Sequence, residues 1–120
     1  MKQKDKNKEL LLKDLSARLP YHTIVSTGEE DLELVKVDIL NGVVYLFSES
    51  FLEFDISEVK PYLRPMSSMT EEEILDYQAF FNYDGVEYPE EYMDWLLSHH
   101  FDFRGLISLG LALEAPKGMY

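Results

Sequence analysis

Hydrophobic residues recur at helical spacing near the start of the chain and in strand-like runs after it. The first pattern predicts an amphipathic helix that Pro20 ends, and residues 1–8 before it are predicted to be a frayed basic tail. The leucines that share one side of this helix are Leu11, Leu12, Leu15 and Leu19.

The strongest structural signal is a pair of apolar runs on either side of Asn41 and Gly42. These two residues favour a two-residue type I′ turn, because both of its central residues take positive φ. The turn fixes a register that places Ile39 opposite Val44. One face of the hairpin is then wholly apolar and is predicted to be buried: Val35, Val37, Ile39, Val44 and Leu46. The other face is mixed: Lys36, Asp38, Leu40, Val43, Tyr45 and Phe47.

Further strands are predicted on both sides of the hairpin. Residues 21–26 and 51–56 fit the same antiparallel meander, the second because its apolar residues alternate. The two prolines of residues 60–65 predict an extended connector, since proline is excluded from regular helices and central strands. Residues 111–115 are predicted to return as a short strand.

Helices are predicted in the second half of the chain. Thr70 and Glu73 have the spacing of a capping box, and the helix that they begin is predicted to run to about Phe81. Pro89 suits the first position of a second helix. A last helical turn is predicted to stop at Gly110 in the left-handed conformation.

These elements predict one α+β domain over residues 1–120. It comprises an N-terminal helix, an antiparallel β-meander with an Asn-Gly hairpin, two or three short helices and a short C-terminal strand. The absence of cysteine excludes a disulfide framework and a thiolate metal site. The basic N-terminal segment has no long apolar run before a cleavage site, so we expect neither a signal peptide nor a membrane span.

The net charge of −12 is spread unevenly. Residues 1–18 hold six basic and three acidic residues, whereas residues 19–120 hold five basic and twenty acidic ones. An acidic body repels phosphate, so direct nucleic-acid binding is not expected. An acidic protein can instead imitate nucleic acid. However, Glu71–Glu73 and Glu90–Glu91 lie where helix N-termini favour negative charge, so their positions have a local explanation.

Residues 99–102, which are His-His-Phe-Asp, form the one cluster of metal-ligand types in the sequence. Neighbouring helical residues point about 100° apart, and no third ligand has a suitable spacing, so no metal site is predicted. His99 and His100 are expected to lie at the negative end of a helix instead. No motif for catalysis or for a cofactor is present, and the chain is predicted not to be an enzyme.

Asp102 and Arg104 share one face if their segment is extended, and they are predicted to form an ion pair. Arg104 and Arg64 are also weak candidates for an anion-binding site, which would gain weight if they met in space.

The many aromatic residues leave more apolar surface than a small core needs, and tyrosine is enriched in protein interfaces. The mixed hairpin face therefore supplies the candidate partner-binding residues, which are Tyr45, Phe47, Lys36 and Asp38. The residues predict a non-catalytic accessory protein that binds another protein. The alternative is an acidic nucleic-acid mimic that occupies a DNA-binding partner, and a weaker one is a small enzyme that uses His99, His100 or Arg104.

The tail from Trp95 to Tyr120 reads WLLSHHFDFRGLISLGLALEAPKGMY. Together with residues 9–20 and 59–73, it resembles a family of small uncharacterised proteins from gut Bacteroides-type bacteria and their phages or mobile elements. Residues 23–58 and 76–90 are less similar to it. The resemblance implies a bacterial cytoplasmic setting and a mobile-element origin, and it implies no catalytic residue.

Overall fold

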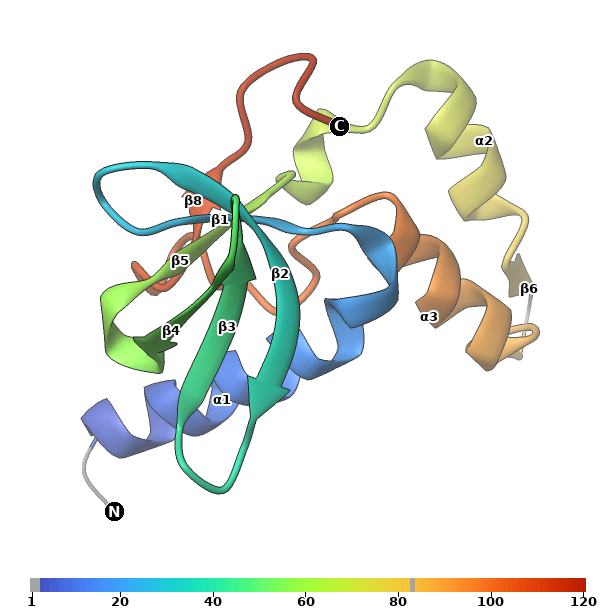
Figure 1. Ribbon diagram of the computed structural model, residues 1–120. Coiled ribbons are helices and arrows are strands. Elements are labelled where there is room, and N and C mark those ends of the chain that lie inside the picture. The colour runs from blue at the N-terminus through green and yellow to red at the C-terminus, as the bar shows by residue number, and fades with distance from the viewer. Residues whose placement is uncertain (1–2, 83) are drawn as a thin grey trace.

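Six strands form the main sheet of this chain, which a computed structural model describes over residues 3–82 and 84–120 (Figure 1). The helices and strands are α1 (Gln3–Arg18), β1 (Ile24–Ser26), β2 (Asp31–Asp38), β3 (Val43–Phe47), β4 (Phe51–Asp55), β5 (Lys60–Leu63), α2 (Glu71–Gln78), β6 (Phe81–Asn82), β7 (Gly85–Val86), α3 (Pro89–Ser98) and β8 (Leu113–Glu114). Short 3₁₀ turns occupy Leu19–Tyr21, Ile56–Glu58 and Met66–Ser68. The predicted α+β fold with an N-terminal helix and a short C-terminal strand is confirmed.

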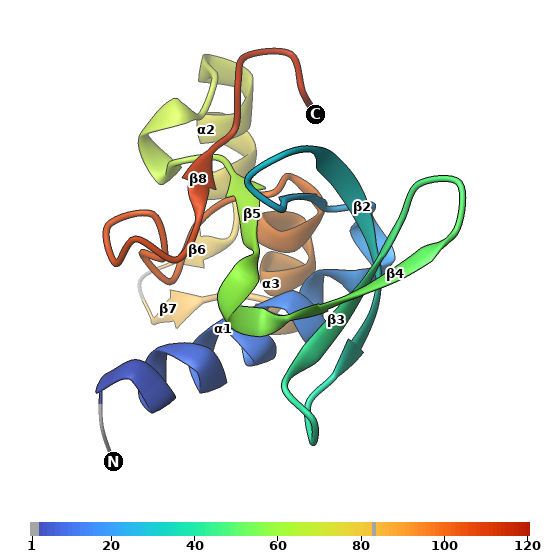
Figure 2. The same ribbon diagram turned by 60° about the vertical axis from the view of Figure 1, so that its left-hand side comes forward.

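The strands of the main sheet lie in the order β4-β3-β2-β1-β5-β8. Neighbouring strands are antiparallel except for β5 and β8, which are parallel. Helix α1 packs across one face of the sheet, and the C-terminal segment returns along the β5 side (Figure 2). The core between helix and sheet comprises Leu11, Leu12, Leu15, Val25, Leu32, Leu34, Val44, Leu46, Ile56, Val59, Leu63, Leu106 and Ala112.

Helix α1 begins earlier than the sequence predicts. The frayed tail expected over residues 1–8 is wrong for residues 3–8, which are helical, and residues 1–2 lie outside the described part of the chain. Lysine and glutamine have good helix propensity, and Asp5 in the first turn complements the positive helix end, so the basic segment can extend the helix. Leu11, Leu12 and Leu15 of α1 are buried as predicted, whereas Leu19 lies in the 3₁₀ turn after the helix and is partly buried.

The loop between β2 and β3 differs from the predicted two-residue turn. Strand β2 ends at Asp38, and residues 39–42 form a four-residue loop. The backbone N–H and the side-chain amide of Asn41 both donate to the Asp38 carboxylate, at 3.1 and 2.7 Å. Gly42 has a φ of 67°, but Asn41 does not take positive φ, so the turn is not type I′. The Asp38 side chain therefore selects a longer loop than the Asn-Gly pair alone favours.

A β-bulge at Val35 also changes the hairpin register. The predicted pairing of Ile39 with Val44 is wrong, because Val37 pairs with Val44. Beyond the bulge, Leu34 rather than Val35 pairs with Leu46. The bulge adds one residue to β2, which returns Leu34 to the core face. Val44 and Leu46 are fully buried as predicted, whereas Ile39 lies in the loop and is 60% exposed.

Strand β5 lies inside the sheet, although residues 60–65 are predicted to be a connector. The chain tolerates Pro61 in this place because the pairing is short. Pro61 pairs with Val25 of β1, whereas β8 pairs only with Tyr62 and Leu63. Because the pairing with β8 does not extend to Pro61, the missing N–H of this proline costs no hydrogen bond to β8.

Residues 70–98, which contain α2, β6, β7 and α3, form a helical arm beside the sheet (Figure 1). The predicted capping box begins α2: Glu73 N–H donates to Thr70 Oγ1 at 3.1 Å, and Thr70 N–H donates to Glu73 Oε1 at 2.9 Å. The helix ends at Gln78, and the strand pair β6–β7 follows, with Tyr83 outside the described residues. Helix α3 begins at Pro89 as predicted.

The last turn before β8 also has the predicted geometry. Gly110 has a φ of 76°, and the backbone N–H of Leu111 donates to the carbonyl of Leu106 at 2.9 Å. Together with the bond from Gly110 N–H to the carbonyl of Ile107, this is a Schellman motif. None of the helices in the described part of the chain has the length and apolar character that crossing a membrane requires.

Candidate functional site

The candidate partner-binding residues of the hairpin lie on the sheet face away from α1, but most of them are already engaged. The Lys36 ammonium lies 4.9 Å from the centroid of the Tyr45 ring, and the Tyr45 hydroxyl donates to Glu53 Oε1 at 2.7 Å. That hydrogen bond raises the pKa of Tyr45. Asp38 holds Asn41, whose hydrogen bonds lower the pKa of the Asp38 carboxyl. Phe47 is 44% exposed and contacts another aromatic ring, that of Phe51.

The two candidate anion-binding arginines are each held by a carboxylate. The Arg64 guanidinium donates to both Glu73 oxygens, at 2.8 and 2.7 Å, and lies 4.3 Å from the centroid of the Phe101 ring. The bond with Arg64 lowers the pKa of Glu73 to about 2. Arg104 Nε donates to Asp14 Oδ1 at 3.0 Å. Neither guanidinium therefore presents an unpaired charge to an anion, and the structure supplies no support for this candidate site.

Asp14 is the centre of a buried network that joins α1 to the C-terminal segment. Asp14 and Arg18 are both fully buried. Arg18 donates to Asp14 through Nε at 2.7 Å and through Nη2 at 3.2 Å, and Nη2 also donates to the carbonyl of Phe101 at 2.8 Å. Arg104 is the third member of the network, because its Nε also donates to the Asp14 carboxylate. A fully buried pair with this geometry holds α1 against residues 101–104.

The predicted ion pair between Asp102 and Arg104 is wrong. Asp102 instead accepts hydrogen bonds from the backbone N–H groups of Leu106 at 2.8 Å and Ile107 at 3.0 Å. It thereby caps the turn that follows, because the first N–H groups of a helical turn have no partner within it. This local role leaves Arg104 to pair with Asp14.

His99 and His100 both have structural roles at the end of α3. His99 Nδ1 lies 2.8 Å from the carbonyl oxygen of Trp95. His100 has a φ of 63° and takes the left-handed position of a second Schellman motif, which is normally a glycine position. Burial lowers the pKa of His100 to about 4, and its ring stacks on Tyr120 with centroids 3.5 Å apart. Within the described residues, no group of three or more potential ligands is placed to hold a metal ion.

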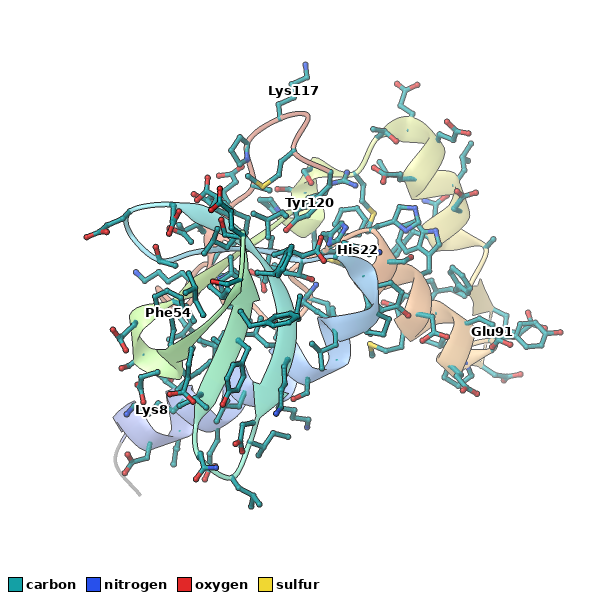
Figure 3. All side chains as sticks on the ribbon, viewed as in Figure 1. Lys8, His22, Phe54, Glu91, Lys117 and Tyr120 are labelled. Carbon is teal, nitrogen blue, oxygen red and sulfur yellow. The ribbon has the colours of Figure 1, made fainter. Side chains whose placement is uncertain are left out.

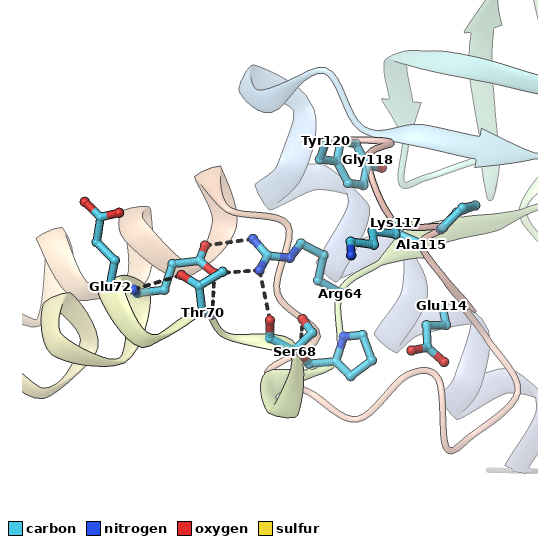
Figure 4. Close-up of a pocket in the computed structure, with 12 residues that line it drawn as sticks. Arg64, Ser68, Thr70, Glu72, Glu114, Ala115, Lys117, Gly118 and Tyr120 are labelled. Atoms are coloured by element: carbon cyan, nitrogen blue, oxygen red, sulfur yellow. Dashed lines mark hydrogen bonds and ion pairs between the residues drawn. The ribbon is translucent and has the colours of Figure 1, made fainter.

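A cavity of about 670 Å³ lies between residues 64–73 and the C-terminal loop (Figure 4). Its inner wall is the Arg64–Glu73 pair, and Tyr120 closes one end. A carboxyl with a pKa near 2 and an arginine do not exchange protons near neutral pH, so this pair cannot act in acid–base chemistry. The remaining charged groups around the cavity are exposed: Glu72, Glu114 and Lys117.

The helical arm carries the most unusual surface of the described chain. Its aromatic rings contact one another with centroids 5.0–6.3 Å apart, and the contacts join Tyr77, Phe80, Phe81, Tyr92 and Trp95. Trp95 also stacks on Phe101 of the body at 5.6 Å. None of the eight residues of α2 is buried.

Large apolar side chains are exposed over the whole arm. They are Ile74, Leu75, Phe81, Val86, Tyr88 and Met93, with Leu75 at 69% and Tyr88 at 63%. Residues 70–98 contain nine acidic residues and no lysine or arginine. Figure 3 shows Glu91 at the far end of the arm, away from Lys117 on the C-terminal loop. The sequence signal for this surface is α2 itself, which has adjacent Ile74 and Leu75 beside three glutamates.

No protein-family model, curated protein or solved structure matches this chain. The resemblance to a family of small proteins from gut bacteria and their mobile elements therefore stays a prediction.

Proposed function

We propose that this chain is a non-catalytic accessory protein of the bacterial cytoplasm that binds another protein through the helical arm. The observation that carries the proposal is α2, an eight-residue helix with no buried residue that exposes Ile74 and Leu75. A helix normally gains most of its stability by burying an apolar face. A partner protein that covers α2 supplies the burial that this helix lacks.

The arm has the composition of a protein-binding surface. Tyrosine, phenylalanine, tryptophan and methionine are enriched at the centres of protein interfaces. The exposed or half-buried residues of these types in the described part of the arm are Tyr77, Tyr88, Tyr92, Phe80, Phe81, Trp95 and Met93. The arm is held against the body by the Arg64–Glu73 pair, by the stack of Trp95 on Phe101 and by the burial of Leu96 and Leu97. A pre-ordered surface loses less conformational entropy when a partner binds.

The charge of the arm favours a basic partner. Nine carboxylates without a basic residue create a negative potential, which attracts a positively charged protein surface. The same charge fits the alternative, an acidic mimic that occupies a DNA-binding partner. The two proposals differ in what supplies the affinity: apolar contacts of the arm in the first, and charge alone in the second.

Site-specific crosslinking tests the proposal. A photo-reactive benzoylphenylalanine replaces either Leu75 on α2 or Leu40 at the hairpin tip, which are both exposed leucines. In lysate of the native host, we expect one protein to crosslink from position 75 and not from position 40. Equal crosslinking from both positions, or none from position 75, contradicts binding through the arm.

The identified partner is then purified and titrated against the chain, with fluorescence of Trp95, the one tryptophan, as the readout. We expect Leu75→Ser to weaken binding about tenfold or more, as at an interface hot spot, and Leu40→Ser to leave it unchanged. If Leu75→Ser has no effect while binding falls by about a thousandfold between 50 and 200 mM salt, the nucleic-acid mimic replaces our proposal.

A further inference from the structure

Strand β4 is an open edge of the main sheet. It pairs with β3 on one side, and no other strand of the described chain lies on its other side. Its sequence, Phe-Leu-Glu-Phe-Asp, contains neither lysine nor proline, which are the usual protections of an edge strand. The opposite edge, β8, is only two residues long.

The backbone of β4 directs hydrogen-bonding groups outward at Phe51 and Glu53. Two bonds define the alternation: Ile56 N–H donates to the carbonyl of Gly42 at 2.9 Å, and Ser48 N–H donates to that of Ser50 at 3.2 Å. Because bonded pairs alternate in an antiparallel ladder, the even-numbered residues of β4 bond to β3 and the odd-numbered ones face away.

The outward-facing ladder has a defined end. The backbone N–H of Asp55, also an odd-numbered residue, donates to Glu58 Oε1 at 3.0 Å in a capping box. A strand added to this edge therefore pairs along Phe51–Glu53 and stops where the box begins.

Apolar side chains flank this edge on both faces of the sheet. On the core face, Leu52 pairs with the fully buried Leu46 and is itself still 36% exposed. On the other face, Phe51 is 70% exposed and contacts Phe47, with ring centroids 5.3 Å apart. An added strand would cover Leu52 on one face and extend the Phe47–Phe51 contact on the other.

We infer that the β4 edge accepts a strand from a basic segment of another protein, in which apolar and positively charged residues alternate. The acidic side chains around the edge, which are Glu49, Glu53, Asp55 and Glu58, supply the charge for this pairing. Opposite charges on neighbouring strands stabilise a sheet, and main-chain bonds give such strand addition its affinity.

A second copy of this chain fits the edge poorly. If two β4 strands paired so that Leu52 met Phe54 of the other copy, Glu53 would lie opposite Glu53, and like charges in that position are destabilising. Each copy also carries a net charge of −12. This inference is independent of the helical arm, since β4 and the arm are different parts of the fold.

The probe is an acetylated and amidated nine-residue peptide of alternating lysine and valine. Amide hydrogen exchange, followed by NMR, reports the outcome residue by residue. With saturating peptide, we expect exchange at Phe51 and Glu53 to slow about tenfold or more, and Trp95 fluorescence to stay unchanged. An alternating glutamate–valine peptide should not bind.

Two variants at one position separate backbone pairing from side-chain contact. Glu53→Ala and Glu53→Pro both remove the bond to Tyr45, but only proline removes the outward N–H, and the bonds to β3 remain. Glu53→Ala should weaken peptide binding roughly two- to fivefold, because it removes a charge. Glu53→Pro should abolish the protection of the β4 amides from exchange. If proline disturbs the fold, a peptide with N-methyl groups along one edge tests the wild-type chain instead.

Three results would overturn the inference. The first is binding of the N-methylated peptide with undiminished affinity, and the second is protection that maps to the arm rather than to β4. The third is concentration-dependent dimerisation through β4, measured by analytical ultracentrifugation, which would assign the edge to a second copy. Because crosslinking from Leu75 tests the arm separately, failure here leaves the proposed function standing.

Discussion

Replacing Asp14 with asparagine should destabilise the chain more than any surface change on the same helix. Asp14 is fully buried and accepts two hydrogen bonds from Arg18, at 2.7 and 3.2 Å, and one from Arg104 at 3.0 Å. The asparagine amide has nearly the same shape but no charge. Arg18 would then remain buried with the carbonyl of Phe101 as its main acceptor.

The expected loss follows from an uncompensated buried charge. Removing one partner of a buried ion pair costs about 3–5 kcal/mol. A chain of 120 residues has a total stability of roughly 6–18 kcal/mol at 0.05–0.15 kcal/mol per residue. The substitution thus removes a large share of it, and the melting temperature should fall by about 10–20 °C.

Urea unfolding followed by circular dichroism measures the change, with Glu9→Gln as the control. Glu9 is an exposed acid on the same helix, so its substitution should stay within about 0.5 kcal/mol of the parent. A double variant, Asp14→Leu with Arg18→Met, should recover much of the loss, because it removes both fully buried charges and leaves only Arg104, which is partly exposed to solvent. If Asp14→Asn stays within about 1 kcal/mol of the parent, the network does not hold α1 to the tail as we argue.

Two further predictions concern left-handed backbone positions. Stability should fall as pH drops from 6.5 to about 4, because burial lowers the pKa of His100 to about 4 and the unfolded chain takes up the proton first. The stabilising contribution of neutral His100 is complete above pH 6.5. The free energy of unfolding in urea should therefore be lower at pH 5 than at pH 7 in the parent, and the difference should be smaller in His100→Asn. An equal difference in both proteins would contradict this. Gly110→Ala should cost about 1 kcal/mol through strain alone, because φ is 76° and, apart from Gly110 and its two chain neighbours, nothing lies within 4 Å of the added carbon. Ser108→Ala on the same turn is the control for thermal unfolding, and equal melting temperatures in both variants would refute the assignment of strain to Gly110.

The elements that the sequence predicts correctly are those whose patterns lie within one or two turns of the chain. The leucines of α1, the capping box of Thr70 and Glu73, and the left-handed stop at Gly110 each depend on residues within one or two turns of one another. Propensity, capping and turn chemistry act at that range, so pattern and structure agree.

The hairpin shows where local signals compete. Asn41 and Gly42 favour a two-residue turn, but the carboxylate of Asp38 caps a four-residue loop and wins. The bulge at Val35 then restores the burial of Leu34, and no alternation of apolar residues marks it. A register based on the turn alone therefore placed Ile39 in the core, although it lies in the loop.

Contacts between distant segments could not be predicted from spacing. Arg104 pairs with Asp14, which is 90 residues away, rather than with its near neighbour Asp102. The exposure of α2 is likewise a tertiary outcome, because Ile74 and Tyr77 have the spacing of a buried face. The candidate hairpin residues share one face as the sequence predicts. Only the structure shows that the Tyr45 ring already contacts Lys36 and that its hydroxyl already donates to Glu53.

The buried Arg18 has a consequence for synthesis on the ribosome. Phe101, whose carbonyl accepts from Arg18, is translated 83 residues after Arg18. Arg104, the second partner of Asp14, is translated 90 residues after Asp14. At about 5–20 residues per second, the 83 residues between Arg18 and Phe101 take roughly 4–17 s to add. During that time α1 exists without residues 101–104, which contact Asp14 and Arg18 in the folded chain. The nascent chain therefore completes this network only after residue 104 has been added, and a chain stalled before residue 101 lacks these contacts of α1.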